Sequence, residues 1–502
     1  MKILTADQIR QWDAYTIAQE PIASIDLMER ASLAFVQWFE EQFPENNQKV
    51  FVLAGTGNNG GDGLVIARLL HQRFYNVEVC LCQVGSKRSP DCEANFQRLP
   101  KGRDVPVFTL KKGEKLPDIS CDILIDGLFG SGLNRPLSGY WASLVEAVNQ
   151  AAFIRVAIDI PSGLFADTHT QSPSISADYT LSFQVPKKAF LFPENQDRCG
   201  HWVVRPIGLH PTFLQTIHGG DHFLDAKMCQ AMLHQRSKYS HKGTFGHALL
   251  VVGSYGKIGA AVLAARACLR SGVGLLSLYA PRCGYDILQN SVPEAMVLPT
   301  TDAEFLTQPP AIERYRAVGA GCGIGTAEAS AEMLKQVLQQ ARHPMVLDAD
   351  ALNILAKHPD YYSLLPPHSI LTPHPKEFQR LFGPTANDFE RHELQKAKAK
   401  ALNVYILLKG ANSCIATPEG DTYFNATGNP GMASGGSGDV LTGMLTALLA
   451  QGYPPKEAIL LGVYLHGLAG DLAVEQVGSQ EALLASDLID YIGQAFKDIR
   501  NT

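Results

Sequence analysis

The feature that most constrains this chain is a regular alternation of short, β-rich apolar runs with helical patterns, which continues through both of its halves. In the first half, the runs predicted as strands cover residues 49–54, 76–82, 121–126, 153–159 and 178–183. Helical patterns cover 25–43, 63–74 and 140–149, and Thr5 with Gln8 is typical of a capping box. Strands that alternate with helices predict an α/β fold with a mostly parallel sheet and helices on both faces.

The second half repeats this alternation. Its predicted strands cover residues 247–253, 274–280, 317–321, 345–350, 369–373 and 404–410. A Pro-Glu-Gly-Asp turn at 418–421 predicts a hairpin, and the end of the chain is predicted to be helical, over residues 439–450, 455–476 and 486–499. We therefore expect a second α/β domain.

A stretch without a sustained period separates the two halves. Residues 206–224 contain two prolines and a Gly-Gly pair, which indicate a linker. A chain of 502 residues can bury more than one core. We expect one domain at residues 1–215 and another at residues 222–502.

The charge balance restricts the class of partner. The chain has 43 Lys and Arg against 49 Asp and Glu, a net charge of −6, which argues against a nucleic-acid or anionic-membrane surface and favours small-molecule substrates. Its 10 cysteines form no CxxC pair, which suits a reducing compartment. No run of 18 apolar residues is present, so we expect a cytoplasmic protein without a membrane anchor, and we also expect a homo-oligomer.

The first glycine-rich loop, GTGNNGGDG at 55–63, follows a predicted strand and opens a helix. Its glycines satisfy the dinucleotide-binding pattern GxGxxG. The acidic residue that normally closes the second strand of such a unit is absent, since that strand ends in Cys82 and Gln83. Asp62 would also repel an anion at the start of a helix. The alternative is a glycine-rich turn in which Asp62 only caps the helix.

Two further loops, DGLFGSGLNRP (126–136) and DIPSG (159–163), come directly after predicted strands. The carboxyl ends of parallel strands converge on one crevice, so Asn59, Asp126, Asp159 and Ser162 are expected to meet there. Their oxygen atoms suit a monovalent or alkaline-earth cation, and the amides of residues 130–133 could hold a phosphate. For each aspartate alone, a helix cap or turn role is equally consistent with the sequence.

The segment NATGNPGMASGGSGDVLTGML (425–445) is the most informative in the chain. It runs from a glycine-rich loop into an apolar helix, so the amides of Gly436, Ser437 and Gly438 are predicted to form an anion hole. Asp439 lies at this positive end of the helix. The helix dipole stabilises a carboxylate there, so Asp439 could have a purely structural role. A base beside an anion hole is also what phosphoryl transfer requires, and we favour that reading.

Three more segments of the second half offer ligand contacts. GSYGKIGAA (253–261) and GAGCGIG (319–325) each follow a strand, and neither has Walker spacing. ILLKGAN leaves Lys409 where it could meet a nucleotide, although a lone lysine is usually only solvated. His374 lies between two prolines, and no HExxH spacing occurs among the 15 histidines.

Taken in order, these motifs resemble one known family. The chain closely resembles the bifunctional NAD(P)H-hydrate repair enzymes over roughly residues 1–499. The motifs that carry this resemblance are, in order, GTGNNGGDG, DGLFGSG, DIPSG, VVGSYGKIGAA, TPHPKEF, LLKG and GGSGDVLTG. The resemblance implies a Rossmann-like three-layer NAD(P)H-hydrate epimerase domain followed by a ribokinase-like, ADP-dependent NAD(P)H-hydrate dehydratase domain.

The resemblance also implies site residues. In the first domain it implies substrate contacts at Asn58, Asn59, Gly60, Gly61 and Asp62 and at Gly130, Ser131, Gly132, Leu133, Asn134, Arg135 and Pro136, a catalytic Asp159 that also contacts substrate, and potassium ligands Asn59, Asp126 and Ser162. In the second domain it implies substrate contacts at Ala260, Gly323 and His374, an adenine-nucleotide site at Lys409, Gly410, Ala411, Asn412, Ser413 and Gly438, and a catalytic base, Asp439, that also contacts substrate. The sequence departs from the family pattern at Cys322, where proline is common, and at Lys376, where glycine is common.

The implied chemistry begins with a hydroxyl on the carbon next to the ring nitrogen of hydrated NADH or NADPH, and hydroxide leaves poorly. Asp439 would take the hydroxyl proton as the oxygen attacks the terminal phosphoryl group of ADP, with Mg²⁺ stabilising the charge. Phosphate then leaves and AMP remains. Only the S form is dehydrated, so an epimerase that interconverts the R and S forms would allow the whole pool to be repaired.

Two alternatives follow from the same residues. The GGSGD segment would also fit a ribokinase-like kinase of a small alcohol, of the hydroxymethylpyrimidine or pyridoxal type, fused to a nucleotide-binding domain. The first domain would also fit a nucleotide-sensing or scaffold module, because a fold does not determine function.

Overall fold

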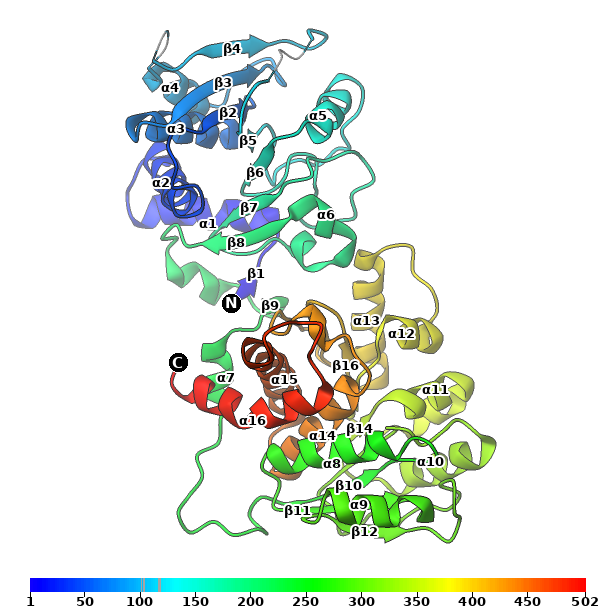
Figure 1. The fold of residues 1–502 in the computed structure, drawn as a ribbon. Coiled ribbons are helices and arrows are strands. Elements are labelled where there is room, and N and C mark those ends of the chain that lie inside the picture. Colours follow the sequence, from blue (N-terminus) through cyan, green and yellow to red (C-terminus); the bar gives the residue numbers. More distant parts are fainter. Residues whose placement is uncertain (101, 103, 116–118) are drawn as a thin grey trace. The chain divides into compact units, whose positions relative to one another are not determined.

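The computed structural model describes residues 1–100, 102, 104–115 and 119–502 (Figure 1). The chain divides into two compact units. We call residues 2–218 with 387–389 the N-terminal unit, and residue 1 with 219–386 and 390–502 the C-terminal unit. Each unit is built on a sheet of mainly parallel strands, and the predicted α/β fold is therefore confirmed.

Every neighbouring pair of strands in the sheet of the N-terminal unit is parallel. The order is β4 (Val107–Leu110), β3 (Asn76–Cys82), β2 (Lys49–Ala54), β5 (Ile123–Gly127), β6 (Ile154–Ile158), β7 (Tyr179–Phe183) and β8 (His201–Arg205). The chain moves outward from β2 to β3 and β4, then returns to β5 on the other side of β2. This reversal creates a topological switch point between β2 and β5, where α/β sheets bind ligands.

Helices cover both faces of this sheet: α1 (Ala6–Gln19), α2 (Ser24–Gln42), α3 (Asn58–Gln72), α4 (Pro90–Arg98), α5 (Tyr140–Gln150) and the short α6 (Gln196–Cys199). Alternate residues of β2 point to opposite faces. Val50 and Val52 share a buried cluster with residues of α2 and α3, whereas Phe51 and Leu53 share another with residues of α5. The capping box predicted at the start of α1 is present, with the Thr5 side chain and Gln8 bonded reciprocally.

The sheet of the C-terminal unit runs in the order β9 (Asp221–Phe223), β18 (Thr422–Asn425), β17 (Ser413–Ala416), β16 (Tyr405–Leu408), β15 (Ile370–Leu371), β14 (Met345–Leu347), β13 (Ala317–Ala320), β10 (His247–Val251), β11 (Leu275–Ala280) and β12 (Met296–Pro299). β17 is antiparallel to both of its neighbours, and β17 with β18 confirms the predicted hairpin around residues 418–421. The chain reverses direction across the sheet at β10, which lies between β11 and β13.

The helices of this unit are α7 (Ala226–Met232), α8 (Ile258–Arg270), α9 (Tyr285–Ser291), α10 (Glu328–Gln340), α11 (Ala349–Lys357), α12 (Pro375–Phe382), α13 (Asp388–Leu402, in this unit from Glu390), α14 (Ser437–Ala450), α15 (Pro455–Val477) and α16 (Ala485–Arg500). They again cover both faces of the sheet. Leu250 of β10 packs in a cluster with α8, α14, α15 and α16, and Leu249 packs in a separate cluster with α10 and α11.

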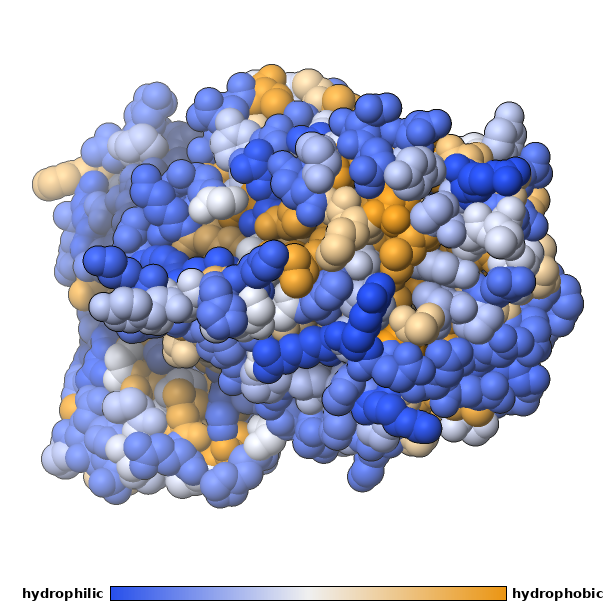
Figure 2. Space-filling view, turned by 90° about the horizontal axis from the view of Figure 1, so that it is seen from below, coloured by the Kyte–Doolittle hydropathy of each residue, from blue (hydrophilic) through white to orange (hydrophobic). Residues whose placement is uncertain are grey.

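One helix of the described chain, α15, is long and apolar enough to cross a membrane by length and composition. Within its most apolar window, 67% of the residues are buried inside the protein, and the helix contributes Leu460, Leu461 and Leu465 to the core of the C-terminal unit. Its apolar character is therefore accounted for by packing. The face of the molecule shown in Figure 2 is mainly hydrophilic, with apolar side chains in small patches.

The structure corrects several predicted boundaries. The first glycine-rich segment is already helical, because α3 begins at Asn58 with Gly57 as its N-cap, so Asp62 lies inside the helix and does not cap it. The strand predicted at 345–350 ends at Leu347, and the chain turns into α11 with Asp348 at the N-cap. The predicted strand at 369–373 shrinks to the two residues of β15.

The predicted linker at 206–224 is not wholly irregular. It contains a 3-10 turn, Pro211–Thr216, and the strand β9, which pairs with β18. The edge strands β4, β8 and β12 and the helices α4, α7 and α9 to α13 were not predicted from the sequence.

Close packing of α14 against α8 generates a stability prediction. A Cβ atom on Gly443 would lie 2.1 Å from the carbonyl oxygen of Ala264, so Gly443→Ala must push the two helices apart. Overpacking of this kind costs about 1–3 kcal/mol or more. We expect a lower free energy of unfolding for this variant, measured by urea denaturation.

The matched control is Gly493→Ala on α16, where no heavy atom lies within 4 Å of the added Cβ. Alanine there should leave stability unchanged or raise it by up to about 1 kcal/mol through helix propensity. Equal stability of the Gly443 variant and the wild type would contradict this account of the packing.

Candidate active sites

The N-terminal unit contains a cavity of about 580 Å³ at the carboxyl ends of its central strands. Residues from the first turn of α3, from the loop after β5, and from the end of β6 line it together. Of the residues predicted for this site, the cavity is lined by Asn58, Asn59, Asp62, Gly130, Ser131, Gly132, Leu133 and Asp159. Segments that are a hundred residues apart in the sequence therefore meet here.

Other predicted contacts lie away from the cavity wall. Gly60 and Gly61 are buried in the packing, and a Cβ on Gly60 would lie 2.0 Å from the carbonyl oxygen of Gly55. Because Gly60 has no side chain, α3 can approach the loop after β2, and Gly61 likewise leaves room for Met28 and Cys92. Asn134, Arg135 and Pro136 are exposed and do not line the cavity.

Asp159 is held at the cavity by a buried lysine. The Lys187 side chain is 1% exposed, and its Nζ donates to Asp159 Oδ1 at 2.6 Å and to Ser182 Oγ at 3.1 Å. The Phe183 amide also donates to Asp159 Oδ1, at 3.0 Å. Asp159 itself has a φ of +63°, a conformation uncommon for a residue with a side chain. Two hydrogen bonds thus fix one carboxylate oxygen of Asp159, and its backbone is strained. Such strain is typical of functional sites.

Two further carboxyl groups face the same cavity. Burial, together with the negative charge of Asp159, raises the pKa of Asp13 to about 7, partly offset by Lys187. Burial and the charges of Asp159 and Asp13 raise the pKa of Asp62 well above its ordinary value. No sequence motif marks Asp13 or Lys187, since Asp13 lies on the amphipathic helix α1 and Lys187 lies beyond the DIPSG motif.

Asp126, Ser162 and Asn59 converge on the carbonyl group of Phe129, as predicted for residues at adjacent strand ends. Asn59 Nδ2 donates to this carbonyl oxygen at 3.0 Å, and Ser162 Oγ lies 3.1 Å from it. Ser162 Oγ also lies 2.6 Å from Asp126 Oδ1, and the Ser162 amide donates to Asp126 Oδ2 at 2.7 Å. Burial raises the pKa of Asp126 to about 6. The cluster holds one carboxylate, one hydroxyl, one backbone carbonyl and the side-chain amide of Asn59.

In the C-terminal unit, Asp439 lies in the first turn of α14, behind the N-cap Gly436 with a φ of +100°. A Cβ on Gly436 would lie 2.5 Å from Leu263, so only glycine fits this turn. Burial raises the pKa of Asp439, and the nearby negative charge of Asp348 acts in the same direction. A hydrogen bond from the Cys322 thiol to the Asp439 carboxylate opposes the shift.

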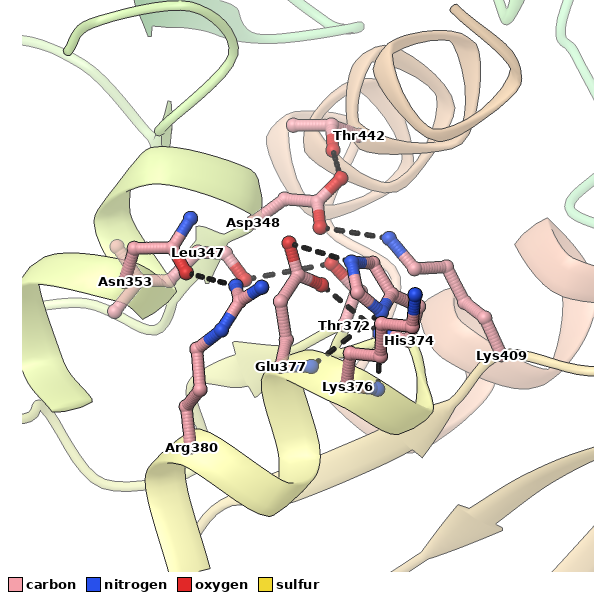
Figure 3. Close-up of polar contacts among 10 residues, drawn as sticks. All are labelled: Leu347, Asp348, Asn353, Thr372, His374, Lys376, Glu377, Arg380, Lys409 and Thr442. Carbon is pink, nitrogen blue, oxygen red and sulfur yellow. Dashed lines mark hydrogen bonds and ion pairs between the residues drawn. The ribbon is translucent and has the colours of Figure 1, made fainter. Parts of the chain in front are cut away.

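Lys409 is not simply solvated. Its Nζ donates to Asp348 Oδ1 at 2.8 Å, and Thr442 Oγ1 donates to Asp348 Oδ2 at 2.9 Å (Figure 3). A Cβ on Gly438 would lie 3.4 Å from both Lys409 Nζ and Asp348 Oδ2. The ends of β14 and β16 and the start of α14 therefore meet in one cluster, which joins Asp348, a residue the sequence analysis had placed inside a strand.

His374 is the N-cap of α12. Its Nδ1 accepts from the Lys376 amide at 3.1 Å, while the Glu377 carboxylate accepts from the His374 amide at 2.9 Å (Figure 3). Burial lowers the pKa of His374, which keeps the ring neutral near pH 7. The imidazole is nevertheless 43% exposed, so the cap leaves its edge accessible to a ligand.

The remaining predicted residues form two small groups. Gly323 packs against the start of α8, where its added Cβ would lie 3.5 Å from the Cβ of Ala260. Ser413 Oγ donates to the Gly410 carbonyl at 3.0 Å, which closes the tight turn of residues 410–413 after β16. Both groups follow strand ends of the same sheet as the cluster around Asp348.

Two family models match the chain. Residues 24–189 match the model described as YjeF-related protein N-terminus, and residues 248–494 match the model described as NAD(P)H-hydrate dehydratase. The first match includes the cavity loops of the N-terminal unit, and the second includes the cluster around Asp348 and Asp439.

Curated relatives match over nearly the full length. The bifunctional NAD(P)H-hydrate repair enzyme of Moorella thermoacetica is 37% identical over 99% of this chain and 97% of its own length. The enzyme of the same name from Escherichia coli K12 is 33% identical over 96% of this chain and 92% of its own length.

Solved structures match the C-terminal part. The ADP/ATP-dependent NAD(P)H-hydrate dehydratase of Bacillus subtilis, co-crystallised with ATP and Mg²⁺, is 36% identical over 55% of this chain and 98% of its own, with a TM-score of 0.50. A ribokinase-like superfamily protein of Enterococcus faecalis is 28% identical over 57% of this chain and 99% of its own, with a TM-score of 0.51. The predicted ribokinase-like architecture of the second half is confirmed by these matches.

The buried pair in the N-terminal unit yields a prediction. Lys187→Met removes the cation and leaves the carboxylate of Asp159, which is 14% exposed, without its counter-charge. Breaking a buried ion pair from one side costs about 3–5 kcal/mol. We expect the N-terminal unit to unfold at a correspondingly lower urea concentration.

The double variant Lys187→Met/Asp159→Asn serves as the control, because it carries no uncompensated charge and should recover part of the loss. A single variant as stable as the wild type would show that the pair does not hold this part of the fold together.

Proposed function

This chain belongs to the family of bifunctional NAD(P)H-hydrate repair enzymes, and from this premise we propose how its residues divide the work. The N-terminal unit interconverts the R and S forms of hydrated NADH and NADPH. The C-terminal unit dehydrates the S form with ADP and releases AMP and phosphate. One observation carries this assignment. Each unit has a carboxylate beside the carboxyl ends of its strands, Asp159 in the first and Asp439 in the second, and both residues lie inside the regions that match the family models.

In the N-terminal unit, the cavity of about 580 Å³ receives the hydrated nicotinamide. Asn58 and Asp62 bind it from α3, and the amides of Gly130 to Leu133 hold the dinucleotide phosphates. Asp159 lies at the reacting carbon as the acid/base group. The hydrogen bonds that Asp159 accepts from Lys187 and from the Phe183 amide orient its carboxylate.

The cluster of Asn59, Asp126 and Ser162 fits a potassium ion. Asp126, Ser162 and the Phe129 carbonyl offer hard oxygens, the Asn59 side-chain amide would add its oxygen, and Asp126 has no cationic side-chain partner within the part of the chain that the structure describes. Bound there, K⁺ would neutralise the buried carboxylate and fix the loop after β5. The loop in turn positions Gly130 and Ser131 at the cavity.

In the C-terminal unit, Asp439 takes the proton from the substrate hydroxyl as that oxygen attacks the terminal phosphoryl group of ADP. The amides at the start of α14, up to Gly438, stabilise the negative charge that spreads over this group. Burial, which raises the pKa of Asp439, makes it a stronger base than an exposed aspartate.

The nucleotide binds along the turn of residues 409–413, with Lys409 beside the phosphates and Gly438 allowing close approach. Ala260, Gly323 and His374 contact the hydrated nicotinamide. Among the described residues, no group of three or more His, Cys, Asp or Glu forms a metal site. Mg²⁺ would therefore be held chiefly by the nucleotide phosphates with one carboxylate, for which Asp348 is suited, and would supply charge neutralisation.

Three further properties belong to the same proposal. The substrates are small molecules, with no role for nucleic acid or a membrane, consistent with the net charge of −6. The 10 free cysteines suit the reducing cytoplasm. We also propose that the chain assembles into a homo-oligomer.

The proposed function is tested by incubating the enzyme with hydrated NADH and ADP. Absorbance near ~340 nm, which reports the reduced nicotinamide, should return, and AMP should form in equal amount. A kinase of a small alcohol fused to a scaffold domain would restore no absorbance. That outcome would overturn the assignment.

Asp439→Asn should abolish most of the dehydration. Removing a general base costs roughly 10²–10⁴ in rate, and asparagine preserves the shape of the side chain. The rate is measured as the return of absorbance from the S form with ADP. Retained turnover would place the base elsewhere, whereas unchanged nucleotide affinity would show that the site is still folded.

Asp159→Asn should abolish exchange between the R and S forms while leaving dehydration of the S form intact, since the substituted residue lies in the N-terminal unit. Exchange is followed without ADP by chromatographic separation of the two forms. Exchange at the wild-type rate would instead support a scaffold role for the N-terminal unit.

A further inference from the structure

A carboxyl group that the family resemblance did not assign faces Asp159 across the cavity. Asp13 lies on α1 and lines the cavity together with Asp159 and Asp62. It has no hydrogen-bond or ion-pair partner within the part of the chain that the structure describes. A half-buried carboxyl group without a partner is costly for stability, so its position calls for a functional explanation.

The two carboxyl groups have opposite electrostatic environments. Asp159 is bound by the buried ammonium group of Lys187 at 2.6 Å, which supplies a counter-charge. Asp13 lacks such a partner and is subject to the negative charge of Asp159, which favours its protonated form. Pairs of groups whose environments differ in this way are typical of acid and base partners in an active site.

Epimerisation at the hydroxyl-bearing carbon needs both partners. This carbon is bonded to the ring nitrogen and to the hydroxyl oxygen, so its configuration can change only if a bond to it opens. A ring opening moves one proton off the hydroxyl oxygen and places one on the ring nitrogen. A single carboxylate cannot perform both transfers at once on the two sides of the carbon.

We propose that Asp13 is the proton donor that complements Asp159 in the epimerase cavity, an inference that rests on the proposed epimerase function. Asp159 accepts the hydroxyl proton as the carbon–oxygen bond becomes a carbonyl group and the carbon–nitrogen bond breaks. Asp13 gives its proton to the departing ring nitrogen. After rotation about the adjacent carbon–carbon bond, the nitrogen attacks the other face of the carbonyl, and both protons return to their original groups.

Other charged groups face the same cavity and shape this arrangement: Arg10 on α1, Asp62 on α3, Asp91 on α4, Asp159 after β6 and, behind it, Lys187. Arg10 is paired with Asp7 at 3.0 Å. Burial and the negative charges of Asp159 and Asp13 raise the pKa of Asp62 well above its ordinary value, which favours its protonated form near neutral pH. Asp13, with a pKa of about 7, can both give and recover a proton there.

The test measures exchange of the purified R form of hydrated NADH by the full-length chain without ADP. Asp13→Asn should lower the exchange rate by roughly 10² or more. Because Asp13 must be protonated to act, wild-type exchange should fall as the pH rises through about 7, and the variant should lose this dependence. Asp13→Glu, which retains a carboxyl group, should recover part of the rate and the pH dependence.

Asp197→Asn is the matched control, an exposed aspartate of the same unit that lies outside the cavity, and it should exchange at the wild-type rate. ADP-dependent dehydration of the S form by Asp13→Asn should equal that of the wild type. If Asp13→Asn does not fold, the pH dependence of exchange by the wild-type enzyme tests the proposal instead. An exchange rate that does not fall above a pH of about 7 would overturn it.

The failures of the two hypotheses are distinguishable. A wild-type enzyme without exchange above the spontaneous rate would overturn the epimerase function itself. Wild-type exchange that Asp13→Asn retains, with the same pH dependence, would overturn only the role of Asp13.

Discussion

A lysine–aspartate ion pair with at least one buried side chain lies at the carboxyl ends of the strands in each unit, and the geometry of both sites depends on it. Lys187 binds Asp159 at 2.6 Å, and Lys409 binds Asp348 at 2.8 Å. A charge in such surroundings is tolerated only with a partner, so each pair fixes the segments that carry it. In the N-terminal unit the pair holds Asp159, the carboxylate that we propose as the acid/base group, whereas in the C-terminal unit it lies beside Asp439 and Gly438.

The positions of these pairs follow from the strand order. In the N-terminal unit the chain reverses between β2 and β5, and the loops after β2, β5 and β6 meet at the cavity. In the C-terminal unit, the segments after β14 and β16 meet the first turn of α14. Parallel topology therefore brings together carboxylates, glycine amides and lysines from distant parts of the sequence.

The sequence predicted the central strands well and the edges poorly. β2 and β3 have the predicted bounds, because continuous runs such as KVFVLA are fully buried on both faces and have no turn residues. β15 has two residues because Pro373 and the cap at His374 end it, and such tertiary limits are not visible in apolar periodicity. The glycine-rich segment was predicted as a loop, but α3 already begins at Asn58. Its glycines at 60, 61 and 63 pack against Gly55, Met28 and Val52 inside the fold.

Site residues were predictable where a loop motif carried them. Asn59 and Asp159 line the cavity as expected, whereas Asp126 and Ser162 bond to each other beside Asn59 and do not line it. Asp13 and Lys187 have no such signal, since Asp13 is one polar position on an amphipathic helix and Lys187 stands beside another lysine in VPKKAF. Only the folded structure shows that the side chain of Lys187 is buried and bonded to Asp159.

The central claim is that one chain repairs both forms of the hydrate. The most direct measurement starts from the purified R form of hydrated NADH, with ADP and the wild-type enzyme, and follows NADH and AMP together. The account predicts complete recovery of NADH, at a rate above that of spontaneous epimerisation, with one AMP formed for each NADH. Recovery limited to the spontaneous rate, or NADH formation without AMP, would contradict it.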